Sequence, residues 1–152
     1  MIDRENRNKL AESCRHYWSC LIDNIEFDEI NFNIESDDRA VNEIKNQLWF
    51  LYDDIRVHRN SGKSKMGDSD ERLLKRVIFF LKSDVEYKWI NPSMIKKVRE
   101  YLRRLFQGAV EVIQEDDEGV KNYWPFFSKA EYNEALVHPK YLTNTEANIE
   151  LS

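Results

Sequence analysis

Glycine, proline and cysteine are scarce in this chain of 152 residues, which holds four, three and two of them. So few turn-forming residues argue against a β-sandwich, which needs a turn after every short strand. There is no run of about 18 apolar residues, so we expect no membrane-spanning helix. The first residues lack the apolar core of a secretory signal, and we therefore expect a protein of the cytoplasm.

Residues that carry chemistry are also few. Cys14 and Cys20 lie more than one turn apart on an expected helix, which argues against a mutual disulfide and favours two buried thiols. His16, His58 and His138 have no second histidine or cysteine at the spacing of a zinc site. We therefore expect neither a metal nor a cofactor.

Two sequence motifs of enzymes are present only in part. Gly62-Lys63-Ser64 resembles the end of a phosphate-binding loop, but Val57 stands where the first glycine is required and a helix replaces the expected strand. Cys14 and His16, two positions apart on a helix, point in different directions and cannot act as a nucleophile and its base. We therefore expect that the protein is not an enzyme.

The chain is rich in the spacing of amphipathic helices. Apolar residues recur every three or four positions over residues 4–25, 36–60, 68–88 and 92–113. Asn91-Pro92 is a helix-start signal, and the short connector before it favours an antiparallel hairpin around which the rest of the chain packs. Ser128 and Glu131 have the spacing of a capping box, which predicts a short last helix ending near His138.

These patterns predict an all-α fold: a single-domain helical bundle of four longer helices plus a short C-terminal helix, spanning residues 1–142. Residues 143–152 are polar and are expected to form a frayed tail. Residues 23–35 alternate acidic and apolar side chains, and because no partner strand is available, we interpret them as a linker packed against the core.

Charge is distributed unevenly along the chain, whose net formal charge is −5. Residues 63–104 hold 12 Lys and Arg against 6 Asp and Glu, whereas residues 1–62 hold 8 against 13 and residues 105–152 hold 3 against 9. Two interpretations remain open. Either the acidic flanks fold over the basic middle, or surfaces of opposite sign meet a partner.

Two stretches resemble proteins of a known class. They are FFLKSDVEYKW at residues 79–89 and YWPFF at residues 123–127. Both are similar to segments of the small, acidic, helical immunity proteins of contact-dependent growth inhibition systems. These proteins share no single motif, so the resemblance transfers no functional residue. It implies a role, which is to bind and occlude one cognate toxin C-terminal domain, in many cases a nuclease with a basic cleft.

An acidic surface suits that role, because carboxylates can imitate phosphate and complementary fields speed association. Residues 115–118 are acids at a helix C-terminus, where they oppose the helix dipole and have no local stabilising role. Aromatic residues beside acids can anchor an interface, although core packing is the alternative. We predict a partner-binding surface made of Asp37, Asp38, Asp53, Asp54, Glu115, Asp116, Asp117, Glu118, Tyr123 and Trp124.

Two other functions remain open. The protein could be a helical protein–protein adaptor or regulatory subunit, with a homodimer as one form of it. It could also be a nucleic-acid-binding regulator that uses the basic hairpin at residues 72–104, because phosphate binds clustered Lys and Arg. The acidic flanks oppose that approach. The basic residues concerned are Lys75, Arg76, Lys82, Lys88, Lys96, Lys97, Arg99, Arg103 and Arg104.

Overall fold

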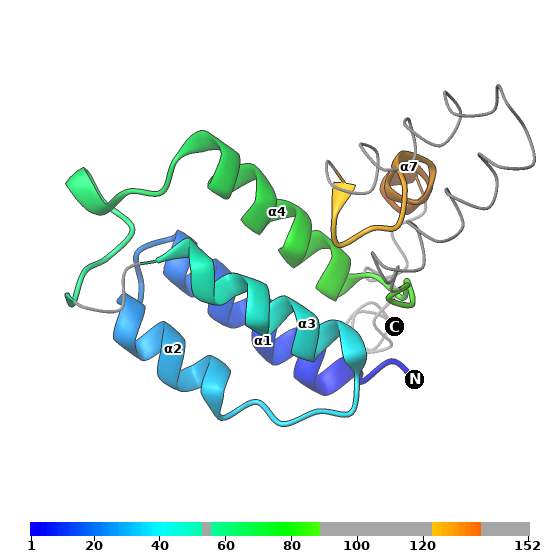
Figure 1. The fold of residues 1–152 in the computed structure, drawn as a ribbon, viewed down its shortest axis with the longest axis horizontal. Helices are drawn as coiled ribbons and strands as arrows, with labels where there is room; N and C mark the ends of the chain where they lie inside the picture. The colour runs from blue at the N-terminus through cyan, green and yellow to red at the C-terminus, as the bar shows by residue number, and fades with distance from the viewer. Residues whose placement is uncertain (53–55, 89–122, 138–152) are drawn as a thin grey trace, which may run out of the picture.

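The computed structural model describes residues 1–52, 56–88 and 123–137. Within these ranges the chain forms five α-helices and two short 3-10 turns without any strand, so the fold is all-α as predicted (Figure 1). The bounds are α1 (Arg4–Trp18), α2 (Asn24–Phe32), α3 (Arg39–Leu48), η1 (Trp49–Leu51), η2 (Gly62–Ser64), α4 (Asp68–Lys82) and α7 (Lys129–Val137). The helix expected over residues 92–113 and the tail at 143–152 lie outside the described residues.

Helix α1 is the central element of the described part of the chain. It packs against α2, α3 and α4, and α7 lies beside the C-terminal end of α4 (Figure 1). The buried apolar side chains of these helices form one core, made mainly of Leu10, Cys14, Tyr17, Phe27, Val41, Ile44, Leu48, Leu74, Val77, Phe80, Leu81 and Phe126. None of the helices in these ranges is long and apolar enough to cross a membrane.

The first predicted helix is too long, and the predicted linker is wrong. Helix α1 begins at Arg4 as expected but ends at Trp18, and the chain then turns at Cys20, whose φ of 60° lies in the left-handed region. Residues predicted as a linker instead form α2. Asp23 and Glu26 make a full capping box at its start, in which each side chain accepts a backbone N–H of the other.

The second predicted helix also extends too far. Helix α3 ends at Leu48, and after η1 the backbone of Tyr52 is extended, with φ −142° and ψ 157°. The Tyr52 ring packs edge-on against Phe27, with 5.4 Å between ring centroids, and lies 6.1 Å from the ring of Tyr17. The packing of Tyr52 against α1 and α2 favours a turn at this position, although the spacing of apolar residues predicts that the helix continues.

The starts of the later helices are confirmed. Helix α4 begins at Asp68, although Gly67 is its N-cap and no side chain caps it. Helix α7 begins after Ser128, whose Oγ accepts the N–H of Glu131 at 3.2 Å. The Glu131 carboxylate in turn accepts the N–H of Phe127 at 2.8 Å, one residue earlier than in the usual capping box.

Candidate functional site

Asp38, one of the predicted partner-binding residues, is buried and paired within the chain. Its side chain is 4% exposed and accepts hydrogen bonds from Arg7 Nε at 2.6 Å and Arg7 Nη2 at 3.3 Å. The backbone N–H groups of Asp3 and Ala40 donate to the same carboxylate. The prediction that Asp38 faces a partner is therefore wrong, because Arg7 and the N-terminus of α3 already use this carboxylate.

The environment of Asp38 favours its charged form. Burial alone raises the pKa of Asp38, but the hydrogen bonds from Arg7, Asp3 and Ala40 outweigh burial, and the pKa is lowered overall. Arg7 also donates from Nη1 to the carbonyl of Val85 at 2.7 Å. The ion pair thus joins α1, the start of α3 and the segment that follows α4.

Asp3, the N-cap of α1, is a second carboxylate held in its charged form. It accepts hydrogen bonds from Ser36 Oγ at 2.6 Å, from Asn6 Nδ2 at 2.7 Å and from the Asn6 N–H at 3.1 Å. These bonds, led by the one from Ser36, lower the pKa of Asp3 from 3.8 to about 2. A carboxylate with a lowered folded-state pKa stabilises the fold fully above its unfolded pKa, and this stabilisation is lost as the pH falls.

We therefore expect the melting temperature to fall as the pH drops from about 4 towards 2, where Asp3 becomes protonated. An Asp3→Asn variant has no such carboxylate at the start of α1. Its melting temperature should start lower at neutral pH and fall less steeply in acid. Thermal unfolding followed by circular dichroism measures both curves, and parallel curves for the two proteins would contradict this role of Asp3.

The other predicted site residues have different environments. Asp37 is exposed. Tyr123 and Trp124 are half-buried against the core: Trp124 donates from its indole N–H to the Tyr87 hydroxyl at 3.1 Å, and the ring of Tyr123 lies 5.6 Å from that of Tyr132. Internal packing accounts for both aromatic residues. Six further predicted residues lie outside the described ranges, namely Asp53, Asp54, Glu115, Asp116, Asp117 and Glu118.

Four basic residues of α4 and of the segment after it are engaged within the chain. Lys75 pairs with Glu71 at 2.6 Å. Two more pairs reach across the fold, from Lys82 to Glu12 at 3.0 Å and from Lys88 to Glu131 at 2.7 Å. Arg76 donates to the carbonyl of Trp124 at 3.2 Å. The Lys82–Glu12 and Lys88–Glu131 pairs join the basic middle to the acidic flanks, which is the kind of contact that one of the two charge interpretations predicts.

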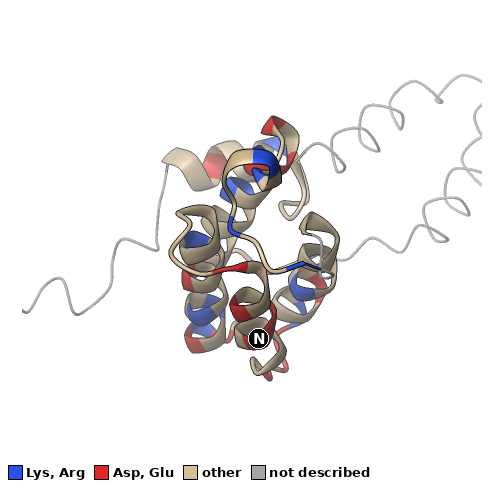
Figure 2. Cartoon of the chain, turned by 90° about the vertical axis from the view of Figure 1, so that its left-hand side faces the viewer, with Lys and Arg blue, Asp and Glu red and all other residues tan. Residues whose placement is uncertain are grey.

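Residues 16–38 carry an excess of negative charge, because they include seven carboxylates and no Lys or Arg. Six of these have no Lys or Arg within salt-bridge distance in the described part of the chain; they are Asp23, Glu26, Asp28, Glu29, Glu35 and Asp37. In Figure 2, α2 accordingly carries red without blue. We call these six residues the acidic surface.

Polar contacts fix the orientation of the helix that carries half of this surface. Asn24 Nδ2 donates to the carbonyl of Arg56 at 2.9 Å, and its Oδ1 accepts the N–H of His58 at 2.7 Å. Asn31 Oδ1 accepts a hydrogen bond from Ser13 Oγ on α1 at 2.8 Å. With these bonds and the stacking of Phe27 on Tyr17 at 4.8 Å, α2 presents Glu26 and Glu29 to solvent.

The acidic surface overlaps the predicted site only at Asp37. The capping-box spacing of Asp23 and Glu26 is a sequence signal for the start of α2, but it does not show which carboxylates lack a cation. Comparisons of the chain with protein-family models, with curated proteins and with solved structures find no match. In the described ranges, no three His, Cys, Asp or Glu side chains gather in a way that could hold a metal ion.

Proposed function

We propose that this protein is an immunity protein that binds a basic toxin domain, such as a nuclease, and neutralises it by occlusion without catalysis. The observation that carries the proposal is the acidic surface, whose six carboxylates are not neutralised by the described cations of the chain. A nuclease must attract phosphate and therefore has a positive cleft. The same field attracts carboxylates that replace phosphate there.

Asp23 and Glu26 also cap α2, and Asp28 accepts the Tyr52 hydroxyl at 2.7 Å, but two properties of the acidic surface support binding. Elsewhere in the described chain, at least one carboxylate on each of α1, α3, α4 and α7 pairs with Lys or Arg, whereas Asp68, Asp70 and Glu134 make no ion pair with a described residue. The acidic surface is the main departure from this pattern. Its helix is held by buried hydrogen bonds, so its charges are presented at fixed positions, which reduces the entropic cost of association.

The proposal also places the protein in the cytoplasm, where a toxin domain delivered by a neighbouring cell would act. Internal pairing of the lysines favours toxin binding over nucleic-acid binding. Lys75, Lys82 and Lys88 are paired with carboxylates of this chain and are less available to phosphate.

Co-expression with the toxin domain encoded by the adjacent gene tests this function. We expect the two proteins to purify as a stable complex and the toxin-expressing cells to survive. The control is the toxin domain of an unrelated system, which should neither bind nor be neutralised. Cell death together with the absence of a complex would contradict the proposal.

A further inference from the structure

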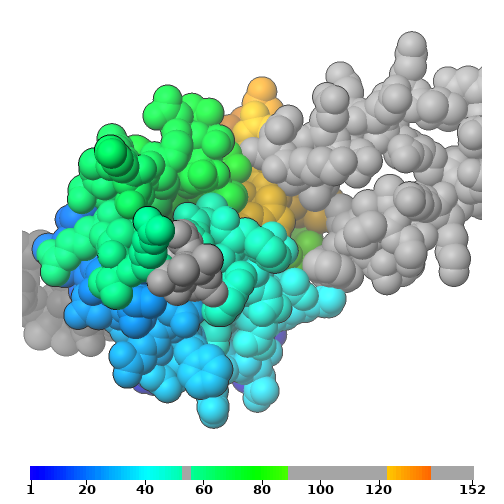
Figure 3. Space-filling view, turned by 60° about the vertical axis from the view of Figure 1, so that its left-hand side comes forward, coloured from blue at the N-terminus to red at the C-terminus, as the bar shows by residue number. Residues whose placement is uncertain are grey.

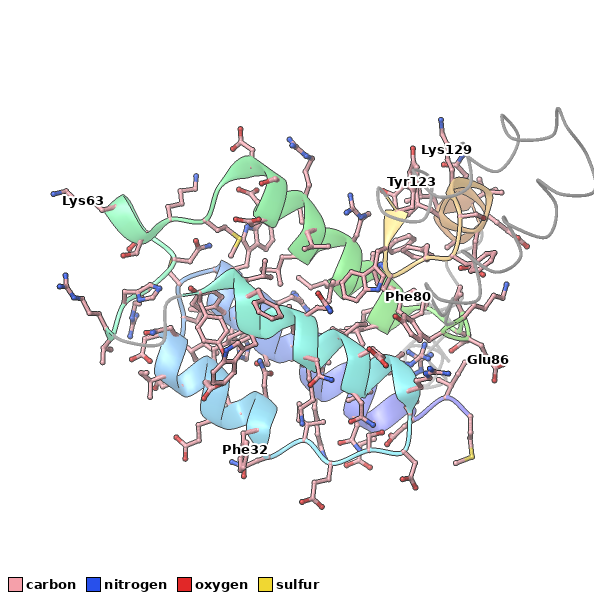
Figure 4. The ribbon with its side chains drawn as sticks, in the orientation of Figure 1. Phe32, Lys63, Phe80, Glu86, Tyr123 and Lys129 are labelled. Atoms are coloured by element: carbon pink, nitrogen blue, oxygen red, sulfur yellow. The ribbon has the colours of Figure 1, made fainter. Side chains whose placement is uncertain are left out.

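Helix α2 buries two polar side chains and leaves three of its four apolar side chains exposed. Asn24 and Asn31 are 0% and 7% exposed, and Phe27 is the one apolar residue of this helix that is buried. In contrast, Phe32 is 80% exposed and Ile25 is 43% exposed. Figure 4 shows the Phe32 side chain at the lower edge of the molecule, directed away from the other helices.

Apart from Phe27, this arrangement differs from the one that burial of apolar surface favours. A helix on the surface of a monomer normally places its apolar stripe against the core, because removing apolar area from water is stabilising. Helix α2 cannot rotate to do so without breaking the hydrogen bonds of Asn24 and Asn31, which would leave buried polar groups without partners. The outward direction of its apolar side chains is therefore built into the packing.

The exposed apolar and acidic residues of α2 alternate on one face. Ile25, Glu29 and Phe32 follow one another at helical spacing and form one row, and Glu26 and Ile30 lie in the neighbouring row. Each apolar side chain therefore has a carboxylate within one turn of the helix. All five side chains are exposed among the described residues, and Figure 3 shows α2 at the surface beside α3.

We propose that the face of α2 made of Ile25, Glu26, Glu29, Ile30 and Phe32 is a docking surface for a basic amphipathic segment of a partner protein. Apolar side chains of that segment cover the isoleucines and Phe32, while its Lys or Arg side chains pair with Glu26 and Glu29. The proposal rests on the proposed function and specifies which surface the toxin domain contacts and with what chemistry.

Charge complementarity favours a basic protein segment over a second copy of this chain, nucleic acid or a lipid surface as the molecule that binds this face. A second copy of this chain docked through the same face would bring Glu26 and Glu29 against the same carboxylates of its partner, and like charges in contact oppose association. Nucleic acid is repelled for the same reason. A lipid surface of anionic headgroups would also oppose these two carboxylates. A basic protein segment satisfies both the apolar and the charged residues of the face.

A variant with Ile30→Ser and Phe32→Ser tests the apolar part of the docking surface. Both side chains are exposed, so the helix should keep its fold, which circular dichroism checks. We expect affinity for the toxin domain of the adjacent gene to fall about 30-fold or more, as for an interface anchor. The matched control is Leu136→Ser on α7, where Leu136 is 52% exposed and should change affinity by less than about twofold.

A second experiment needs no toxin. The isotope-labelled full chain is titrated with a synthetic helical peptide of Lys and Leu, and separately with one in which Glu replaces each Lys. We expect amide chemical-shift changes at residues 25–33 with the Lys–Leu peptide, their loss in the Ile30→Ser and Phe32→Ser variant, and no change with the Glu–Leu peptide. Shifts centred on α4 or α7, or shifts unaffected by the variant, would overturn the proposed surface.

The two experiments separate the surface from the function. If the Lys–Leu peptide docks on α2 and no complex forms with the toxin domain, the docking surface stands and the immunity function fails. If the toxin domain binds the Ile30→Ser and Phe32→Ser variant as tightly as it binds the unchanged chain, the function stands and the docking surface fails.

Discussion

Replacing Asp38 with alanine is expected to lower the free energy of unfolding by about 3–5 kcal/mol, as when one partner of a buried ion pair is removed. The change leaves the guanidinium of Arg7, whose side chain is 1% exposed, without its carboxylate. It also removes the side-chain cap of α3, because the N–H of Ala40 loses its acceptor. Urea unfolding followed by circular dichroism measures the difference.

The adjacent residue provides a matched control. Asp37 is exposed and, among the described residues, makes no ion pair, so Asp37→Ala should change the free energy of unfolding by less than about 0.5 kcal/mol. An Asp38→Asn variant keeps an acceptor for the Ala40 N–H and should be more stable than Asp38→Ala. Equal effects of Asp37→Ala and Asp38→Ala would show that the buried pair does not hold this corner of the fold together.

Reversing charge on the acidic surface is expected to slow association with the toxin domain about tenfold or more, because electrostatic attraction acts mainly on the association rate. The variant is Glu29→Lys with Glu35→Lys. Both residues are exposed, and neither carboxylate has a Lys or Arg within salt-bridge distance in the described ranges. Surface plasmon resonance at low and at physiological salt should also show a weaker salt dependence than for the unchanged chain.

The control for charge reversal has the same change in net charge at the other end of the molecule. Glu86 and Glu134 are exposed and lie near α7, away from α2, so Glu86→Lys with Glu134→Lys alters net charge without altering the acidic surface (Figure 4). We expect a much smaller effect on the association rate. If the two double variants slow association equally, net charge alone determines the association rate, and the acidic surface is not where the toxin domain is attracted.

Local signals in the sequence predict most of the helix starts. The periodicity of apolar residues indicates where α4 begins, and the cap at Ser128 indicates where α7 begins, because caps depend on residues close together in the chain. The same kind of signal, Asp23 with Glu26, marks α2. The alternation of Phe32 and Ile34 with polar residues obscures this signal, because alternation is not typical of a helix, and the segment is therefore predicted as a linker.

The ends of helices and the environments of site residues depend on contacts between residues far apart in the sequence, which local spacing does not reveal. The predicted helix over residues 36–60 is too long because Tyr52 packs on Phe27 of α2, and the sequence pattern predicts a linker where α2 lies. Asp37 and Asp38 are alike in sequence, yet only Asp38 meets Arg7, 31 positions away. Ion pairs between residues far apart in the sequence, such as Arg7 and Asp38, determine which carboxylates remain without a cation. The acidic surface can therefore be identified only in the folded chain.

Amide hydrogen exchange of the full chain, alone and with the toxin domain encoded beside it, tests the central claim most directly. We expect exchange to slow across residues 21–37 on binding, while α7 and the solvent-facing side of α4 exchange as in the free protein. Protection confined to α4 or α7, with residues 21–37 unchanged, would show that the acidic surface is not where the partner binds.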